Sequence, residues 1–303
     1  MNCSVRGAGY KGSATRDQRA AQFESEQKRL LRLAYRMLGS VTEAEDAVQD
    51  AWLRWHGKED EVDNAAAYLT RVVTRVCLDR LKSAQRRREI YVGPWLPEPL
   101  VCEVEVDHWI EDDITYSLML AMERLSPLER AAFLLHDVFD IPLSEIALTL
   151  EREPAAVRKL ASRARRNIKE ERKRYSIDAE GADRMARAFF IAARDGDTAQ
   201  LSAMLAEDVE IHTDGGGRIF ALRNIVRGIE RVIRLLQHAN RKHVAYPTLL
   251  HTMIVDGLPG YLSLDDGIPQ ATILDSRDGK IVGIYIVKNP DKLTHMQLPA
   301  GLD

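Results

Sequence analysis

Apolar residues recur at every third or fourth position through the first third of the chain, which predicts three amphipathic helices. The first helix covers about residues 18–38. Thr42, followed three residues later by Glu45, is a capping-box pattern that opens the second helix. The third begins after residue 63 or 64 and extends to about residue 88, with apolar side chains on one side and arginines on the other.

A linker is predicted at residues 91–100, because one glycine and three prolines in ten residues exclude a helix interior. Helical periodicity resumes near residue 114 and continues to about residue 175. It is interrupted at Ser126 and at Ile141, each followed by a proline, where new helices are expected to start.

The pattern changes beyond residue 178. Two helices are predicted at about 178–194 and 198–205. Short apolar or alternating segments follow, set off by glycine, proline and aspartate turns. These predicted strands cover residues 209–213, 249–255, 261–264, 271–274 and 281–287. The last 125 or so residues therefore form an α+β domain.

Composition excludes several classes of protein. Hydrophobic residues make up 45% of the chain and charged residues 29%, which is typical of globular domains. No apolar run approaches the roughly 20 residues that a membrane helix needs, and the first residues have no apolar signal core. The three cysteines are scattered, so neither a disulfide framework nor a metal site is expected. We expect a cytoplasmic protein with no cofactor and no membrane partner.

Charge is distributed very unevenly along the chain. Residues 64–88 contain seven basic side chains and one acidic one, and residues 151–174 contain ten basic and four acidic. Between these blocks, residues 98–113 contain seven acids and no lysine or arginine. Two basic helices therefore flank an acidic connector, a distribution that favours nucleic-acid binding despite a net charge of −3.

The sharpest local pattern is a helix-turn-helix between residues 143 and 168. A short amphipathic helix is followed by a turn at residues 151–153, and Pro154 occupies the first position of the next helix. Apolar residues of this second helix face the core, which leaves its polar face for phosphates and base edges. Many such turns have glycine where Glu151 stands. The expected DNA-binding residues are Arg158, Lys159, Ser162, Arg163 and Arg166.

Asp46, Gln49 and Asp50 fall at helical spacing and are expected on one face of the second helix. This face adjoins the basic third helix. The pairing suggests one module with two surfaces, one for a basic protein partner and one for DNA.

These segments resemble the parts of a bacterial RNA polymerase sigma factor of the extracytoplasmic-function group. Residues 42–55 resemble the polymerase-clamp-binding helix of sigma domain 2, and residues 64–88 resemble the helix of that domain that reads the minus-10 element. Residues 125–166 resemble sigma domain 4, which reads the minus-35 element. The order of the parts and the linker between them are similar as well.

Three short strings narrow the resemblance: Trp-Leu-Pro-Glu-Pro at 95–99, Asp-Gly-Gly-Gly-Arg at 214–218 and Asn-Pro-Asp-Lys-Leu at 289–293. Together they are similar to the SigJ-like sigma factors, which carry a C-terminal SnoaL-like domain of the NTF2-like fold. The resemblance implies that this fused domain takes the place of a separate anti-sigma protein.

The resemblance implies core RNA polymerase, through its β′ clamp, and promoter DNA as partners. It implies polymerase contacts by Asp46, Gln49 and Asp50, and minus-10 contacts by Arg71, Arg75, Lys82 and Arg86. We further expect the two C-terminal strings to pack against the linker string. The residues of this regulatory contact are Trp95, Pro97, Asp214, Gly215, Gly216, Gly217, Asn289, Pro290 and Asp291.

The expected fold is therefore multidomain, with two all-α sigma domains and a C-terminal α+β NTF2-like cone. The predicted division is a flexible tail at 1–17, sigma domain 2 at 18–90, a proline-rich and acidic linker at 91–113, sigma domain 4 at 114–175, and a SnoaL-like regulatory domain at 178–303. No catalytic residue is expected, and a small-molecule ligand of the last domain is left open.

Two alternatives remain. A helix-turn-helix regulator with a ligand-sensing C-terminal domain explains residues 143–166. It leaves the helix of Asp46, Gln49 and Asp50 and the basic helix at residues 64–88 without a role. An enzyme of the SnoaL-like type would use a carboxylate and an aromatic hydroxyl for proton transfer inside the cone. The candidate residues for that chemistry are His212, Asp214, His251 and Tyr261.

Overall fold

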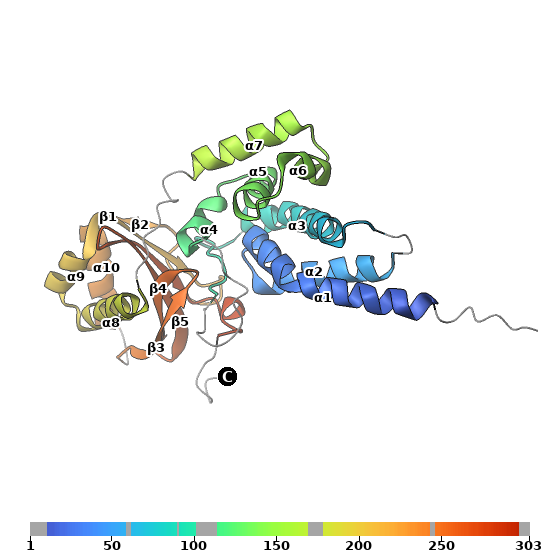
Figure 1. The fold of residues 1–303 in the computed structure, drawn as a ribbon. Helices are drawn as coiled ribbons and strands as arrows, with labels where there is room; N and C mark the ends of the chain where they lie inside the picture. Colours follow the sequence, from blue (N-terminus) through green and yellow to red (C-terminus); the bar gives the residue numbers. More distant parts are fainter. Residues whose placement is uncertain are drawn as a thin grey trace, which may run out of the picture. The chain divides into compact units, whose positions relative to one another are not determined.

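The computed structural model describes residues 11–58, 62–89, 91–100, 114–168, 178–242 and 246–296 (Figure 1). These residues divide into two compact units. The first combines the described residues up to Ser83 with Ser126–Ala164. The second combines those of Ala84–Leu125 with those from Arg165 onward. The linker and the first helix after it therefore belong to the unit that holds the β-sheet.

The N-terminal part of the first unit consists of α1 (Lys11–Leu38), α2 (Val41–His56) and α3 (Ala65–Glu89) as far as Ser83. Helices α1 and α2 pack along each other, and the large side chain of Trp55 is buried. Its indole nitrogen donates a hydrogen bond of 2.9 Å to the Arg19 carbonyl, which satisfies the buried N–H group.

The remaining helices of this unit are α5 (Pro127–Phe133), the π-helical turn Leu134–Val138, α6 (Leu143–Leu150) and α7 (Pro154–Asn167) as far as Ala164. A capping box starts α5, because the Ser126 side chain accepts from the Glu129 backbone and the Glu129 side chain accepts in return. Helix α6 ends at Glu151, whose φ of 54° is left-handed. Pro154 then starts α7, so α6 and α7 form the predicted helix-turn-helix.

The second unit contains a six-stranded sheet with the order β2-β1-β6-β5-β4-β3. Strands β1 and β6 are parallel, and every other neighbouring pair is antiparallel. The strands are β1 (Leu205–Asp214), β2 (Val226–Arg227), β3 (Thr248–Val255), β4 (Leu258–Asp265), β5 (Ile268–Arg277) and β6 (Lys280–Val287). The helices are α4 (Tyr116–Met122), α8 (Ala179–Asp195), α9 (Thr198–Met204) and α10 (Ile229–Lys242).

Successive side chains of a strand point to opposite faces of a sheet, and each face of this sheet is covered by its own hydrophobic cluster. On β4, Tyr261 joins a cluster with α8, α9 and α10, which include Phe189. Leu262, the next residue, joins a cluster on the other face with Leu96 of the linker and Tyr116 of α4. The linker therefore supplies part of the core of the C-terminal domain.

The three hairpins of the sheet use the same two-residue turn. Asp256-Gly257, Asp266-Gly267 and Asp278-Gly279 all have positive φ at both positions. Aspartate followed by glycine is a preferred pair for such turns, whose twist matches that of the strands they join. These turns fix the register of β3 to β6.

The predicted helices and the α+β class of the C-terminal half are confirmed, with three differences of detail. Helix α1 begins at Lys11, seven residues before the expected start, and residues 1–10 of the expected tail lie outside the described residues. The capping box predicted at Thr42 is wrong, because Ser40 has the extended backbone of a cap and accepts from the Glu43 N–H. Helix α10 and strand β2 were not predicted.

Within the described ranges, no helix is long and apolar enough to cross a membrane. The same part of the chain holds no group of three His, Cys, Asp or Glu residues placed to bind a metal. Cys77 is buried as a free thiol, and its burial raises the pKa well above the ordinary value. Cys3 and Cys102 lie outside the described residues.

Candidate functional site

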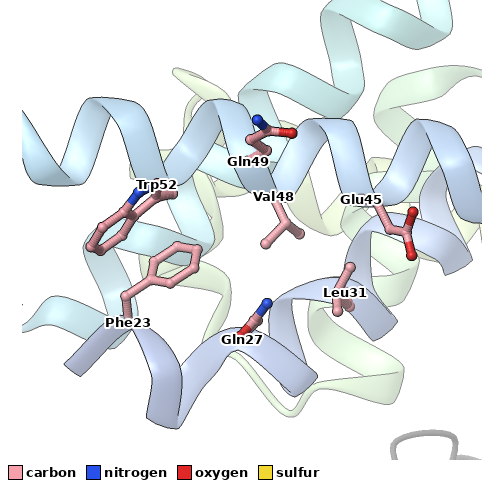
Figure 2. A pocket seen from close by; sticks show the side chains of 7 residues that line it. All are labelled: Phe23, Gln27, Leu31, Glu45, Val48, Gln49 and Trp52. Atoms are coloured by element: carbon pink, nitrogen blue, oxygen red, sulfur yellow. The ribbon is translucent and has the colours of Figure 1, made fainter. Parts of the chain in front are cut away.

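A groove of about 360 Å³ runs between α1 and α2 (Figure 2). At one end, the rings of Phe23 and Trp52 lie 4.9 Å apart, and Leu53 nearby on α2 is 61% exposed. The other lining residues are Gln27, Leu31, Glu45, Val48 and Gln49. The groove thus combines an aromatic end with amide and carboxylate groups, a composition suited to protein contacts.

The two aspartates of α2 are held by an arginine of α3. Arg80 donates to Asp50 Oδ2 at 2.8 Å and to Asp46 Oδ2 at 3.4 Å. Burial by itself lowers the pKa of Arg80, but the hydrogen bonds and charges of both carboxylates raise it above its ordinary value. Of the three residues predicted to share a surface, Gln49 lines the groove, while Asp46 and Asp50 are oriented by α3 and stay about half exposed.

The basic side chains predicted on α3 have different surroundings. Lys82 is exposed and forms an ion pair with Asp79 at 3.1 Å. Arg71 is half-buried, and its Nε has no hydrogen-bond partner. Arg75 is 43% exposed and contacts the helix-turn-helix. The Arg86 side chain lies outside the described part of the chain.

The outer face of α7 carries all five predicted residues. Arg158, Lys159, Ser162, Arg163 and Arg166 are exposed, whereas Val157, Leu160, Ala161 and Ala164 are buried, as predicted. Arg163 forms an ion pair with Glu129 at 2.8 Å. Burial raises the pKa of Glu129, but its bonds to Ser126 and Arg163 outweigh this and lower the pKa.

Asp214, at the end of β1, is fully buried and ties the linker to the sheet. Its carboxylate accepts four hydrogen bonds: from the Tyr91 hydroxyl at 2.6 Å, the Leu96 N–H at 2.9 Å, the Gly216 N–H at 2.9 Å and Lys292 Nζ at 2.7 Å. Four donors, one of them cationic, compensate a buried carboxylate. We call these five residues the Asp214 clasp.

Lys292 completes the clasp from the C-terminal side. Its Nζ also donates to the Leu96 carbonyl and lies 4.1 Å from the centre of the Trp95 ring. The lysine therefore makes an ion pair, a hydrogen bond and a cation–π contact within one buried site. Because Leu96 uses both its N–H and its carbonyl, the linker backbone is fixed at this residue.

The glycine string and the Asn289 loop approach each other closely at the clasp. A Cβ on Gly216 would lie 2.5 Å from the Asn289 side chain, and one on Gly215 would lie 2.1 Å from the Ile219 carbonyl. Gly216 also has a φ of 65°, which favours glycine. Asn289 donates to the Tyr91 hydroxyl at 3.1 Å.

The linker is held at a second point by α4 and the C-terminal segment. The buried Tyr116 hydroxyl donates to the Pro97 carbonyl at 2.7 Å. The His295 ring lies between two acceptors, the Glu98 carboxylate at 3.2 Å and the Pro99 carbonyl at 2.6 Å. Burial lowers the pKa of His295, but these contacts and the charges of Glu98 and Asp256 raise it above its ordinary value.

The four residues considered for proton transfer do not form one site. Asp214 belongs to the clasp, and His251 is exposed. Tyr261 lies in the helix-side cluster, where burial raises its pKa to about 12. His212 packs 5.3 Å from Tyr285, which belongs to the cluster on the other face, and burial lowers the pKa of His212.

Comparison with known proteins places this geometry in a family. The family models Sigma-70 region 2 and Sigma-70, region 4 match residues 22–87 and 116–168. The ECF RNA polymerase sigma factor SigJ of Mycobacterium tuberculosis is 35% identical over 292 residues, which cover 90% of this chain and 93% of that protein. The probable ECF RNA polymerase sigma factor SigI of the same species is 31% identical over 291 residues, or 93% of this chain and 97% of that protein.

A solved structure agrees with these matches. The crystal structure of SigJ from Mycobacterium tuberculosis matches with a TM-score of 0.74 and 31% identity, over 91% of this chain and 98% of that one. This chain belongs to the extracytoplasmic-function sigma factors of RNA polymerase. The predicted family and fold class are therefore confirmed. The match to region 2 also accounts for α2 and α3, which the helix-turn-helix regulator alternative left without a role.

The structure of this sigma factor brings the predicted linker and C-terminal strings together and adds residues that the sequence did not single out. Trp95, Asp214, Gly216 and Asn289 contact the clasp or belong to it. Gly215 packs beside them, Pro97 accepts from Tyr116, and Asp291 forms an exposed pair with Arg218 at 3.0 Å. Gly217 lies beside Val92, and Pro290 is exposed at the start of the turn Pro290–Lys292. The residues missed are Tyr91, Tyr116 and His295, and Lys292 was predicted only as part of the string at 289–293.

Removing the cation of the clasp should destabilise the sheet-containing unit strongly. Lys292→Met leaves the buried Asp214 charge without its counterion, which typically costs about 3–5 kcal/mol. The control is Arg218→Met, which breaks a pair that is more than 60% exposed on both sides and should cost less than about 1 kcal/mol. Urea unfolding of the full chain, followed by circular dichroism, measures both. An equal loss in the free energy of unfolding in the two variants would contradict the role of Lys292 as the counterion of Asp214.

The stability of the same unit should fall as the pH rises above neutrality. The folded-state pKa of His295 is raised, so its contribution is fully present below the unfolded value of about 6.5 and is lost as the pH rises through the folded value. His212 has a lowered pKa, so its effect has the opposite sign and lies below pH 6.5. Urea unfolding from pH 6.5 to 9 should show the decline, and His295→Gln should flatten it. A parallel decline in that variant would refute the role of His295.

Proposed function

We propose that this sigma factor binds the β′ clamp of core RNA polymerase through α2 and reads promoter DNA with α3 and α7. We further propose that its C-terminal domain restrains transcription initiation by holding the linker. The observation that carries the second part is the buried Asp214 clasp, which joins the linker to the end of β1 and to Lys292. The protein then acts in the cytoplasm as a regulator and not as an enzyme.

The polymerase-binding role of α2 is supported by its groove and its oriented acids. Trp52, which lies over the buried Phe23 ring, is of a residue type that often contributes most to protein binding. Asp46 and Asp50 are already positioned by Arg80, so less side-chain entropy is lost when a basic partner binds. Gln49 lies between the two features, in the wall of the groove.

The DNA-binding roles are supported by the exposure of the basic residues. Arg158, Lys159 and Arg166 project from α7 and are available for phosphates and base edges of the minus-35 element. On α3, Arg71, Arg75 and Lys82, with Arg86 further along the same helix, are proposed for the minus-10 element. Each phosphate contact adds salt-dependent affinity.

The regulatory role follows from what the clasp does to the linker. The acidic linker is suited to a basic polymerase channel that otherwise holds nucleic acid. In this structure its residues 95–99 are instead held by Asp214, Tyr116, Lys292 and His295. A linker held in this way is not free to enter polymerase. Any signal that opens the clasp acts only through its differential affinity for the open state.

In this proposal the functional domains are those at 18–90, 114–175 and 178–303, joined by the linker at 91–113. Helix α4 belongs by sequence to region 4 and packs in the same unit as the sheet. We therefore assign α4 a second role, as part of the surface that retains the linker through Tyr116.

The groove assignment predicts a specific loss of polymerase binding. Gln49→Arg places a cation in the groove, opposite a basic partner, and should lower the affinity for core RNA polymerase about 10-fold or more. The matched control is Gln18→Arg, the same change at an exposed position of α1 outside the groove lining. Titration of labelled core polymerase measures both. Equal affinities for the two variants would remove the groove from the interface.

The clasp assignment predicts higher activity when the linker is loosened. Trp95→Ala removes the ring over Lys292 and should raise transcription in vitro several-fold, with an unchanged ranking of promoters in a library. Phe220→Ala, which removes an aromatic ring that is 89% exposed in the same unit, is the control and should behave like the parent. Parental activity in Trp95→Ala, or a changed promoter ranking, would contradict the restraint.

A further inference from the structure

A direct contact joins the proposed minus-10 helix to the helix-turn-helix. Arg75 of α3 donates from Nη2 to Glu151 Oε1 at 2.6 Å and from Nε to the Thr149 carbonyl at 3.4 Å. Both acceptors lie at the C-terminal end of α6, where the helix dipole is negative. The guanidinium of Arg75 therefore occupies an anionic site formed by region 4.

Two further contacts fix the same arrangement inside the first unit. The buried Arg130 of α5 donates to the Met37 carbonyl at the end of α1, at 2.8 Å. The guanidinium of Arg32 on α1 lies 5.0 Å from the centre of the Phe139 ring, just beyond the π-helical turn. These contacts join regions 2 and 4 without using Arg75, so the Arg75 contact is not needed to explain why the regions pack together.

This packing differs from the arrangement that a promoter requires. The minus-10 and minus-35 elements are separated by roughly 25 base pairs, or about 85 Å of duplex at 3.4 Å per base pair. A hydrogen bond between Arg75 and the turn that precedes α7 is incompatible with such a separation of the two readers. The described state is thus a state of the free protein.

We propose that Glu151 is a built-in competitor of promoter DNA: its carboxylate occupies Arg75 in the free protein and is displaced by a DNA phosphate. This inference rests on the proposed role of Arg75 in DNA binding. It assigns a function to the acidic residue that stands where many helix-turn-helix turns have glycine. The Glu151 backbone is slightly strained at a φ of 54°, and glycine would avoid this strain. The Glu151 side chain, however, supplies a carboxylate that glycine lacks.

The exposure of the pair explains why it acts as a competitor and not as a permanent lock. The side chains of Arg75 and Glu151 are 43% and 72% exposed, and exposed ion pairs are weak and screened by salt. A phosphate can replace the carboxylate with no desolvation of a buried charge. The expected effect on DNA affinity is accordingly a few-fold.

The test uses the full chain, a fluorescein-labelled duplex of 40 base pairs and anisotropy titrations over a series of salt concentrations. Glu151→Gln should raise the affinity about two- to five-fold and steepen the salt dependence by about one unit, because Arg75 becomes free to contact a phosphate. The matched control is Glu153→Gln, which removes the same charge from an exposed residue of the same turn. When Arg75 is already replaced by glutamine, Glu151→Gln should raise the DNA affinity no more than Glu153→Gln does.

A crosslink reports the docked state independently of DNA affinity. Cysteines introduced at Asp79, one turn from Arg75, and at Arg152, next to Glu151, should be joined by a short bis-maleimide in the free chain after Cys3 and Cys102 are replaced by serine. An excess of the duplex should reduce the crosslink.

The outcomes separate this inference from the proposed function. Equal effects of Glu151→Gln and Glu153→Gln, with Arg75→Gln still weakening DNA binding, would overturn the competition and leave the DNA role of Arg75 intact. Parental DNA affinity in Arg75→Gln would remove that role and the inference together. Absence of the crosslink in the free chain would overturn the docked state itself.

Discussion

The structure of the C-terminal unit depends on one buried carboxylate. Asp214 lies at the end of β1, where it accepts hydrogen bonds from the Tyr91 hydroxyl of the linker, the neighbouring Gly216 N–H and Lys292 Nζ near the C-terminus. A buried charge of this kind is tolerated only when its partners are complete, so the clasp forms as a whole or is strongly destabilised. The same requirement makes the linker backbone, through the Leu96 N–H, a structural ligand of the sheet domain. Because the buried charge needs the Leu96 N–H as a partner, it fixes the linker, a segment whose composition is that of a connection between two domains.

The linker also has a packing role that the hydrogen bonds alone do not show. Leu96 and Tyr116 fill one face of the sheet, while α8, α9 and α10 cover the other. Without the linker and α4, Leu262, Ile273 and their neighbours on that face would be exposed as a contiguous apolar surface. Opening the clasp therefore exposes apolar area as well as a charge. The proposed restraint on transcription has a hydrophobic component that persists at high salt, unlike the ion pairs of the helical unit.

The sequence was sufficient for the elements whose signals are local. Ser126 and Glu129 mark a helix start, Pro154 marks another, and the apolar positions of α7 separate its buried and exposed faces. The clasp was predicted only as three strings in contact, because its pairing depends on the parallel register of β1 and β6, in which Asp214 lies opposite Val287. That register brings Lys292 to a carboxylate 78 residues away, a relation with no local signal.

Helix α10 and strand β2, which were not predicted, differ in whether the sequence carries a local signal for them. Helix α10 was predictable, since residues 229, 232, 233 and 236 follow helical spacing. Strand β2 has two residues and exists only by pairing with β1. The contact of Arg75 with Glu151 likewise needs tertiary structure, because neither residue is unusual in its own helix or turn.

The two ion pairs differ in their exposure to water, which explains their different uses. The Asp214–Lys292 pair is nearly inaccessible to water, so breaking it is costly. The Arg75–Glu151 pair is largely hydrated and exchanges partners readily. The buried Asp214–Lys292 pair is therefore suited to a lasting restraint on polymerase binding. The exposed Arg75–Glu151 pair is suited to a contact that DNA itself must displace.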